Sequence, residues 1–404
     1  MINKTNILNR RPFVAVSFSV LFLSICSYHF AARVDINIAV LVILSGLLSL
    51  MSITDQVKGF VFSVAKNPKK HFLPLCVLVS AAGGLIINLA NVVETSLFLT
   101  LFFLTYVIHF KKDSDVINFA TKLVICSGVF MSFGVLTGFF ESIFLSSKLF
   151  YHVPMGYPYF LSQKHIYSGF GFNQNYSAYI IIVALSFLFS SEFNVSRKLR
   201  NYLALLFILA LLITGARIVF LFFSLIAVNY FFKKSVNKCL IGLIFIALYL
   251  LFTHIIVGLP GTYELGTSHY RELLFSIGNI DFILGNYGYM KLAYFAELRE
   301  NLFFPVNLKE VTQSIGADPH SLFYSLIILG GPPLLLSIVV FLTLGILKNL
   351  TFIEQNYSKF YYCGLVSIIT ETLVWDATNS IFFWFIILYA ITISKDAVKH
   401  QTIS

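Results

Sequence analysis

Charged residues are scarce in this chain: only 11% of the residues are Asp, Glu, Lys or Arg, whereas 58% are hydrophobic. A composition this rich in apolar residues excludes an ordinary water-soluble domain. Runs of about 20 apolar residues are what a helix needs to cross the hydrocarbon core of a bilayer. The 44 phenylalanines and 21 tyrosines also fit a surface that faces lipid. We therefore expect an all-α integral membrane protein.

Features that mark other protein classes are missing as well. The five cysteines lie inside or beside apolar runs without disulfide or metal-site spacing, so we interpret them as small packing residues. No set of His, Cys, Asp and Glu has metal-ligand spacing, and no glycine-rich phosphate loop is present. We therefore predict no metal, no cofactor and no cytoplasmic nucleotide site. The first apolar run starts near Phe13 and has no clear cleavage site behind it, so we expect it to be retained.

Apolar runs predict about 12 transmembrane helices in one polytopic domain over residues 1–404. The runs are 13–32, 38–54, 72–90, 96–110, 118–145, 175–193, 201–215, 217–232, 239–258, 321–347, 360–375 and 380–394. With the N-terminus inside, 19 Lys and Arg residues fall in inner segments and 8 in outer ones. This bias follows the positive-inside rule, so both termini are expected to face the cytoplasm. The net charge of +10 is then mostly a topology signal, and no nucleic-acid partner is expected.

This orientation places two large loops on the outer face, at 146–174 and 259–320. The second loop carries seven acids against four bases, so it is not a general anchor for anionic lipids. Its stretch 271–280, RELLFSIGNI, could form an amphipathic helix lying on the membrane surface. The Gly-Asn-Tyr-Gly sequence at 285–288 indicates a turn. A long polar interruption between apolar blocks is where we expect function to lie.

Arg217 and His320 are the first candidates for chemistry. Arg217 stands in a tight turn at the outer edge of two otherwise uncharged spans. It is either a topology residue that extends to the membrane surface or a clamp for a diphosphate, since a guanidinium offers paired donors to phosphate oxygens. His320 lies where the large loop re-enters the membrane. It is either an interfacial residue bonded to the backbone or a general base.

The remaining candidates are polar residues that would bind substrate. Asp318 would orient the His320 imidazole or cap the following helix. Arg271, beside Tyr270, is a substrate contact or an ordinary solvated arginine. Asn173 and Asn175 enter the sixth span, where an asparagine binds sugar hydroxyls or simply caps the helix.

The order and spacing of these signals resembles the bacterial O-antigen ligase and O-antigen polymerase superfamily of membrane glycan transferases. TGARIVFLFFSLI is similar to the family's Thr-x-Ser-Arg-Gly segment, with Arg217 in the arginine position. DPHSLFYSLIILGG is similar to its His-Asn-x-x-Leu…Gly-x-x-Gly segment, with His320 in the histidine position. YRELLFSIGNIDFILGNYG and GFGFNQNYSAY resemble its other two segments. The sequence departs from the family at Ser321, which replaces the usual Asn, and at Ala216 and Ile218 beside the arginine.

The resemblance implies a GT-C-like fold with a large periplasmic loop between spans 9 and 10, in the bacterial inner membrane. It implies a metal-independent glycosyltransferase of lipopolysaccharide biosynthesis, whose donor is a glycan on undecaprenyl diphosphate. The acceptor would be lipid A–core for a ligase or a second lipid-linked repeat for a polymerase. In this interpretation Arg217 and His320 are catalytic, and Arg271, Tyr270, Asp318, Asn173 and Asn175 bind substrate.

Several alternatives stay open at this point. We favour the ligase over the polymerase because one large outer loop ends in the Arg and His arrangement typical of ligases. A protein O-oligosaccharyltransferase is a third enzyme of the same kind, although the chain has no large C-terminal outer domain. A transporter or flippase also suits twelve spans and would need ionisable residues at mid-membrane, for which Lys122, His109, Glu141, Glu371 and Asp376 are the candidates.

Overall fold

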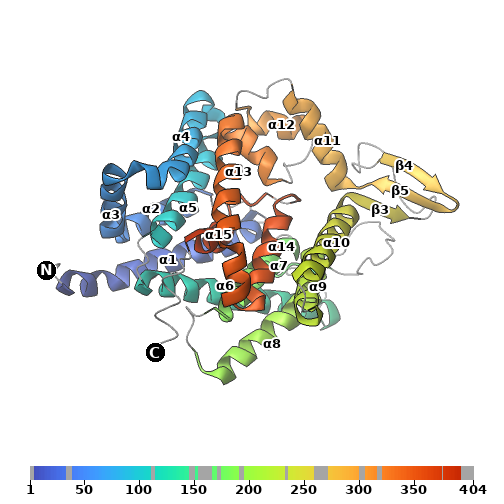
Figure 1. Ribbon diagram of the computed structural model, residues 1–404, viewed down its shortest axis with the longest axis horizontal. Coiled ribbons are helices and arrows are strands. Elements are labelled where there is room, and N and C mark those ends of the chain that lie inside the picture. Colours follow the sequence, from blue (N-terminus) through green and yellow to red (C-terminus); the bar gives the residue numbers. More distant parts are fainter. Residues whose placement is uncertain are drawn as a thin grey trace.

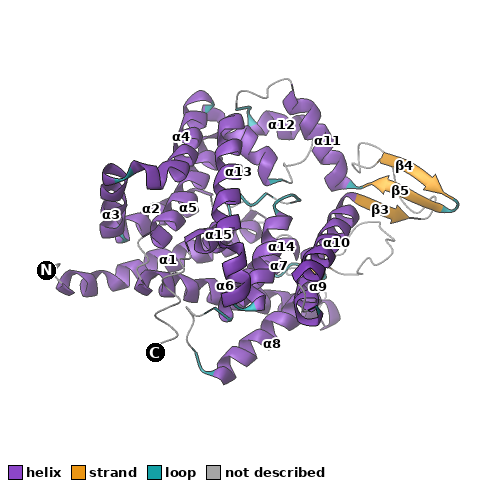
Figure 2. Ribbon diagram, in the orientation of Figure 1, coloured by secondary structure: helices purple, strands orange, loops and turns teal. Residues whose placement is uncertain are grey.

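The computed structural model shows a body made mostly of helices, with a small sheet at one edge (Figure 1, Figure 2). It describes residues 4–32, 39–110, 114–144, 151–152, 166–170, 174–190, 195–232, 235–258, 272–299, 305–315, 321–374 and 376–392. The first helices are α1 (Lys4–Ala32), α2 (Ala39–Ser52), α3 (Thr54–Lys66), α4 (Phe72–Ile87), α5 (Val92–Phe110), α6 (Ser114–Phe144) and α7 (Gln174–Leu188). They are followed by α8 (Arg197–Thr214), α9 (Arg217–Phe231), α10 (Ser235–His254), α11 (Asn286–Leu298), α12 (Leu308–Ile315), α13 (Leu322–Asn356), α14 (Lys359–Glu371) and α15 (Ile381–Thr392).

Each of the twelve apolar runs contains a helix, and several of these helices are long enough to cross a membrane. Among the described residues, five pass this test: Pro68–Ile87, Leu89–Phe110, Asp115–Phe144, Val236–His254 and Leu322–Gln355. The pair α2 and α3 passes together but is bent by 78°. The prediction of a helical membrane protein is therefore confirmed in its general form. The number of twelve spans, the orientation and the GT-C-like arrangement stay predictions.

Non-helical backbone interrupts one predicted span and separates two others. Within α13, Gly331 has φ 68° and is followed by Pro332 and Pro333, which lack the N–H groups that a helix interior requires. Between α14 and α15, the described residues 372–374 and 376–380 are not helical, and most of them are buried. There the Asp376 carboxylate accepts bonds from the backbone N–H and the hydroxyl of Thr378, at 2.9 and 2.7 Å. The Trp384 indole donates to the Thr378 carbonyl at 2.8 Å, so side chains satisfy backbone groups that helices would otherwise satisfy.

Helices α4 and α13 lie side by side in a close contact that depends on Gly84. An ideal Cβ at this position would lie 2.1 Å from the Leu329 carbonyl oxygen and 2.7 Å from Gly330 Cα. Both atoms belong to the backbone of α13, so neither can rotate away. The neighbouring Gly83 has no atom within 4 Å of its ideal Cβ position.

We expect Gly84→Ala to force α4 away from α13 and to lower stability by about 1–3 kcal/mol, as overpacking does elsewhere. Gly83→Ala is the matched control, and we expect its stability to stay within about 1 kcal/mol of the parent protein because glycine is the less favourable residue in a helix. Melting of the two variants in detergent, followed by size-exclusion chromatography after heating, measures the difference. Equal melting temperatures would show that the contact is not as close as described.

The outer segment is folded onto the helical body. Strands β3 (Ile255–Gly258), β5 (Ile280–Leu284) and β4 (Glu272–Ile277) form an antiparallel sheet in the order β3–β5–β4, beyond the end of α10 (Figure 1). A second, two-stranded sheet pairs β1 (Tyr151–His152) with β2 (Ile166–Tyr167). Asn91 fixes the segment after α11, because its side chain donates to the Val306 carbonyl at 2.7 Å and accepts from the Leu308 N–H at 2.9 Å.

Two sequence predictions for this segment are wrong. Residues 272–280 of the stretch predicted as a surface helix form β4, a two-residue turn and the first residue of β5. The two strands pair from Glu272 with Leu284 to Ile277 with Ile280. The reason is the Gly278-Asn279 turn, whose glycine has φ 58° and reverses the chain in two residues. The Gly-Asn-Tyr-Gly stretch predicted as a turn begins α11 instead, with Gly285 as its N-cap. Strands in this segment were not predicted at all.

Candidate functional site

Arg217 is positioned by a tight reversal between two helices. Helix α8 ends at Thr214, and Gly215 follows with φ 58°, the left-handed conformation that commonly terminates a helix. The Ala216 N–H donates to the Thr214 hydroxyl at 3.4 Å, and Arg217 is then the first residue of α9. The Thr-Gly-Ala-Arg sequence therefore places a guanidinium at the very end of a hairpin of apolar helices.

The Arg217 side chain is exposed and reaches across to α10. Its Nη1 donates to the Thr253 carbonyl at 3.2 Å, one residue before α10 ends. This hydrogen bond holds the guanidinium against the end of α10. Because a guanidinium has five N–H donors, donors remain beyond this bond. The Arg217 side chain is thus held in place and still able to contact a ligand.

Glu371, the last residue of α14, lies beside these residues in a buried position. Its carboxylate accepts a hydrogen bond from the Tyr249 hydroxyl on α10. Arg217 and Lys291 lie near enough to act on the carboxylate electrostatically. Glu371 is close enough to act on the Tyr179 phenol of α7 in the same way. Glu371 therefore links α14 to α10 by a hydrogen bond and lies within electrostatic reach of residues on α7, α9 and α11.

Lys291 brings the outer segment into this group. It extends from α11 and hydrogen-bonds both the His254 Nε2 atom and the Leu373 carbonyl, which follows Glu371 by two residues. The His254 Nδ1 atom lies 2.6 Å from the Leu250 carbonyl, so Nδ1 carries the proton and Nε2 accepts from the lysine ammonium. Burial lowers the pKa of Lys291 to about 8, and Glu371 partly opposes that shift. The ammonium is therefore still mostly protonated at neutral pH.

The start of α13 borders the same residues. The Leu322 N–H donates to the Thr372 carbonyl at 3.1 Å, directly after Glu371. The Tyr324 hydroxyl donates to the Lys291 carbonyl at 3.0 Å. Ser321 caps α13 by accepting from the Phe323 N–H at 3.3 Å. The beginning of α13 is thus attached to both Lys291 and the residue after Glu371.

We call Arg217, Tyr249, His254, Lys291 and Glu371 the Arg217–Glu371 cluster. The Arg217 guanidinium and the Lys291 ammonium both act electrostatically on the one carboxylate, and the His254 imidazole is bonded to Lys291. With two cations and one acid, the cluster carries a surplus of positive charge. The carboxylate and phenol are buried, whereas the Arg217 guanidinium is exposed. Such an arrangement holds cationic donors in fixed positions and presents one of them to a ligand. It is chemically suited to bind an anion with several oxygen atoms, such as a phosphate or diphosphate.

The structure describes only two of the seven sequence-predicted site residues. Arg217 is part of the Arg217–Glu371 cluster. Asn175 stands in the first turn of α7, four residues before Tyr179 and hence on the same side of that helix. The other predicted residues lie outside the described residues. They are Asn173, Tyr270, Arg271, Asp318 and His320.

Four members of the cluster were not identified as site residues from the sequence. Glu371 was noted only as an ionisable residue for a transporter, although a lone acid in an apolar run is a signal for function. Lys291 was one base among eight on the outer side, and His254 was one histidine near a span end. Nothing in the sequence indicates that Lys291 and His254, on separate elements, hydrogen-bond each other.

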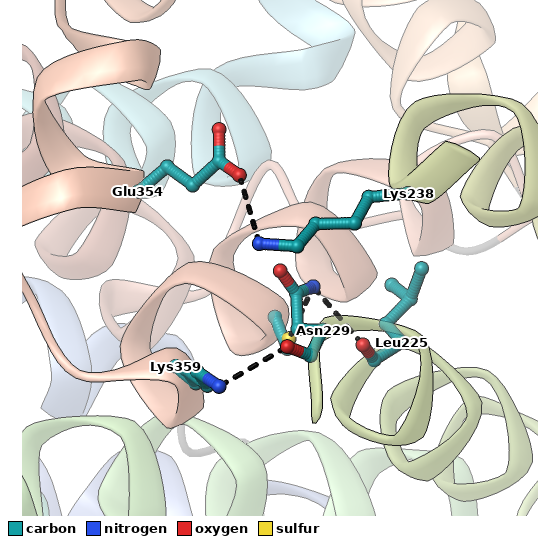
Figure 3. Close-up of polar contacts among 6 residues, drawn as sticks. Leu225, Asn229, Lys238, Glu354 and Lys359 are labelled. Atoms are coloured by element: carbon teal, nitrogen blue, oxygen red, sulfur yellow. Dashed lines mark hydrogen bonds and ion pairs between the residues drawn. The ribbon is translucent and has the colours of Figure 1, made fainter. Parts of the chain in front are cut away.

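The opposite end of the same helices has a different character (Figure 3). There Lys359 donates to the Asn229 carbonyl at 3.1 Å, and the Asn229 amide donates to the Leu225 carbonyl and to Cys363 Sγ. Lys238 forms an ion pair with Glu354 at 3.9 Å, joining α10 to α13. These bonds and the ion pair join α9, α10, α13 and α14 at this end.

Within the described ranges, no three His, Cys, Asp or Glu side chains gather as a metal site would require. Comparisons with protein-family models, with curated proteins and with solved structures found no match to this chain.

Proposed function

We propose that this protein is a membrane glycan transferase that moves a glycan from undecaprenyl diphosphate to an acceptor sugar on the periplasmic face of the bacterial inner membrane. The supporting observation is the Arg217–Glu371 cluster, in which an exposed guanidinium and a second cation stand at the end of membrane helices. A lipid-linked diphosphate needs cations at that level, because its lipid lies in the bilayer and its charge lies at the edge. The sequence resemblance supplies the substrate class.

The proposed reaction is a single transfer with all atoms accounted for. The acceptor hydroxyl oxygen bonds to the anomeric carbon of the donor sugar, and the bond from that carbon to the diphosphate oxygen breaks. The hydroxyl proton passes to His320 as general base, and the diphosphate leaves with the electron pair. Arg217 stabilises the charge that develops on the leaving group, and Lys291 adds a second positive charge to the same site. Breaking the sugar–phosphate bond supplies the energy.

The other predicted residues complete the substrate contacts in this proposal. Arg271 and Tyr270 would contact the donor from the outer loop, and Asn173 and Asn175 would bind sugar hydroxyls at the start of α7. Asp318 would orient His320. Asn175 supports this assignment by standing one turn before Tyr179, which lies beside Glu371.

A deletion strain tests the proposal through its lipopolysaccharide banding pattern and its lipid-linked glycan. For a ligase, we expect long lipid-linked polymer to accumulate while the lipid A–core stays bare. For a polymerase, the core instead carries a single repeat. Complementation with the parent gene must restore the normal pattern. An unchanged pattern in the deletion strain would contradict both forms of the proposal.

One structural observation favours a second candidate, a transporter or flippase for the lipid-linked glycan. Both the break in α13 at Gly331 and the break between α14 and α15 resemble the discontinuous helices that transporters use, and Glu371 is a buried acid at one of them. In this case the deletion strain would hold its lipid-linked glycan on the cytoplasmic leaflet. Labelling of the glycan with a membrane-impermeant reagent from the periplasmic side would then fail, whereas it succeeds for the transferase.

A further inference from the structure

The hairpin formed by β4 and β5 exposes large apolar side chains although it lies outside the helical body (Figure 1, Figure 2). Every residue from Glu272 to Ile280 is exposed. Among them are Phe275 at 50%, Ile277 at 64% and Ile280 at 45% exposure. Between Glu272 and Asp281 the sequence LLFSIGNI contains no charge. A hairpin of this composition in water would be a site of aggregation, so something other than water is expected to cover it.

Both faces of β4 expose apolar side chains, and this restricts what can bind to the hairpin. Leu273 and Phe275 pair with Ile283 and Phe282, which are neighbours in β5 and therefore point to opposite faces of the sheet. Both Leu273 and Phe275 are exposed. Phe275 stacks on Phe282 of β5 with 4.6 Å between ring centroids, yet half of it stays open. A protein partner docked on one face would leave the other face in water. A fluid surrounding of lipid covers both.

The hairpin is also continuous with the apolar surface of a candidate membrane span. Strand β3 begins at Ile255, immediately after α10 ends at His254, and β3 pairs with β5. Only 17% of the apolar part of the span Val236–His254 is buried within the protein, so most of its side chains lie on the outer surface of the helical body. Leu251 and Phe252, in the last turn of α10, are exposed. The sheet therefore starts at the level where this helix leaves the hydrocarbon core.

The edge of the sheet limits how deeply the hairpin inserts. β4 is the outermost strand, so its outward N–H and C=O groups have no partner within the sheet. Such groups are costly in hydrocarbon and are satisfied by water or by lipid headgroups. The apolar side chains and the polar strand edge are both accommodated in the layer between headgroups and acyl chains.

We propose that the β4–β5 hairpin inserts its apolar side chains into this interfacial layer, on the side of the membrane where α10 ends. It anchors the outer segment at the bilayer surface and thereby steadies α11, which follows β5 and carries Lys291. The attraction is apolar rather than electrostatic, because the hairpin carries no cation. This inference does not depend on the proposed transferase activity.

The test uses the full-length protein in vesicles, with an environment-sensitive NBD label at Ile277→Cys. The five native cysteines are first replaced by alanine, and Gln313→Cys on α12 serves as the exposed polar control. We expect the label at position 277 to show blue-shifted emission and to be quenched at least twofold more by a nitroxide at carbon 5 of the lipid chain than by aqueous iodide. The control is expected to show the reverse order.

The proposal also predicts the same result in phosphatidylcholine vesicles and in vesicles with 30% phosphatidylglycerol. Leu273→Cys repeats the measurement on the other face of β4, where Leu273 pairs with Ile283, so that loss of folding in one variant does not decide the outcome. Quenching by iodide at both positions, equal to that of the control, would overturn the proposal. Efficient disulfide dimers through position 277 would overturn it as well, because they would assign the hairpin to a second copy of the chain.

Discussion

Replacing Arg217 with alanine is expected to lower glycan transfer by about 10²–10³-fold, the usual effect of removing one donor that stabilises developing charge. Membrane abundance should be unchanged, because the Arg217 side chain is exposed and its hydrogen bond at 3.2 Å goes to a backbone carbonyl. His320→Ala should have a similar effect if His320 accepts the acceptor's proton. Transfer is measured in membranes with lipid-linked donor and lipid A–core acceptor, alongside a deletion strain complemented by each variant.

Two control variants are needed. One tests whether a positive charge at position 217 is sufficient, and the other tests whether loss of any exposed arginine lowers transfer. Arg217→Lys keeps the charge but loses the paired donors, so we expect partial activity between those of the parent and the alanine variant. Arg197→Ala removes an exposed arginine from the far end of the preceding helix, α8, and should leave transfer unchanged. Normal transfer by both Arg217→Ala and His320→Ala would contradict the site assignment.

Replacing Glu371 with leucine is expected to cost about 2–3 kcal/mol of stability, because a hydrogen bond to a charged group is lost and its buried donor is left without an acceptor. The change leaves the buried Tyr249 hydroxyl without its acceptor and Lys291 without a nearby negative charge. Glu371→Gln keeps an acceptor oxygen for Tyr249, so its loss should be smaller, about 1–2 kcal/mol. Melting temperatures in detergent give the order of stability.

The ion pair at the other end of the bundle provides the comparison. Lys238 and Glu354 are partly exposed, at 23% and 31%, and their charged atoms lie 3.9 Å apart (Figure 3). We expect Glu354→Leu to change stability by about 1 kcal/mol or less, as for other exposed pairs. If Glu354→Leu destabilised the protein as much as Glu371→Leu, burial of the Arg217–Glu371 cluster would not explain the effect.

Apolar run length predicted the helices well and the outer segment poorly, for a physical reason. A helix in lipid must be apolar over most of its length, so composition alone locates it. In the stretch 272–284 the apolar residues fit a helical stripe and also two short strands. The Gly278-Asn279 pair between two apolar runs is a hairpin signal, and it was outweighed by the assumption of a surface helix. The breaks in α13 and after α14 depend on packing that no local pattern encodes.

The sequence identified a residue of the candidate site only where that residue differs strongly from its neighbours in the chain. Arg217 stands out because it is a lone cation between apolar spans, and the family resemblance gave it a role. Lys291 looks like any base in a polar loop, and its importance comes from contacts with His254 and Leu373 across elements far apart in sequence. Contacts of this kind arise from the tertiary fold, so single-sequence reasoning does not find them.

The bonds at both ends of α9 and α14 restrict how these helices can vary in length. Helix α9 is joined to α10 through Arg217 at its first turn and to α14 through Asn229 near its last. Helix α14 carries Cys363 toward one end and Glu371 at the other. Inserting one residue in either helix would turn its far end by about 100° and shift it by about 1.5 Å, which separates one set of partners while the other holds. Natural relatives should therefore gain and lose residues in the connecting loops, and keep both helices at constant length.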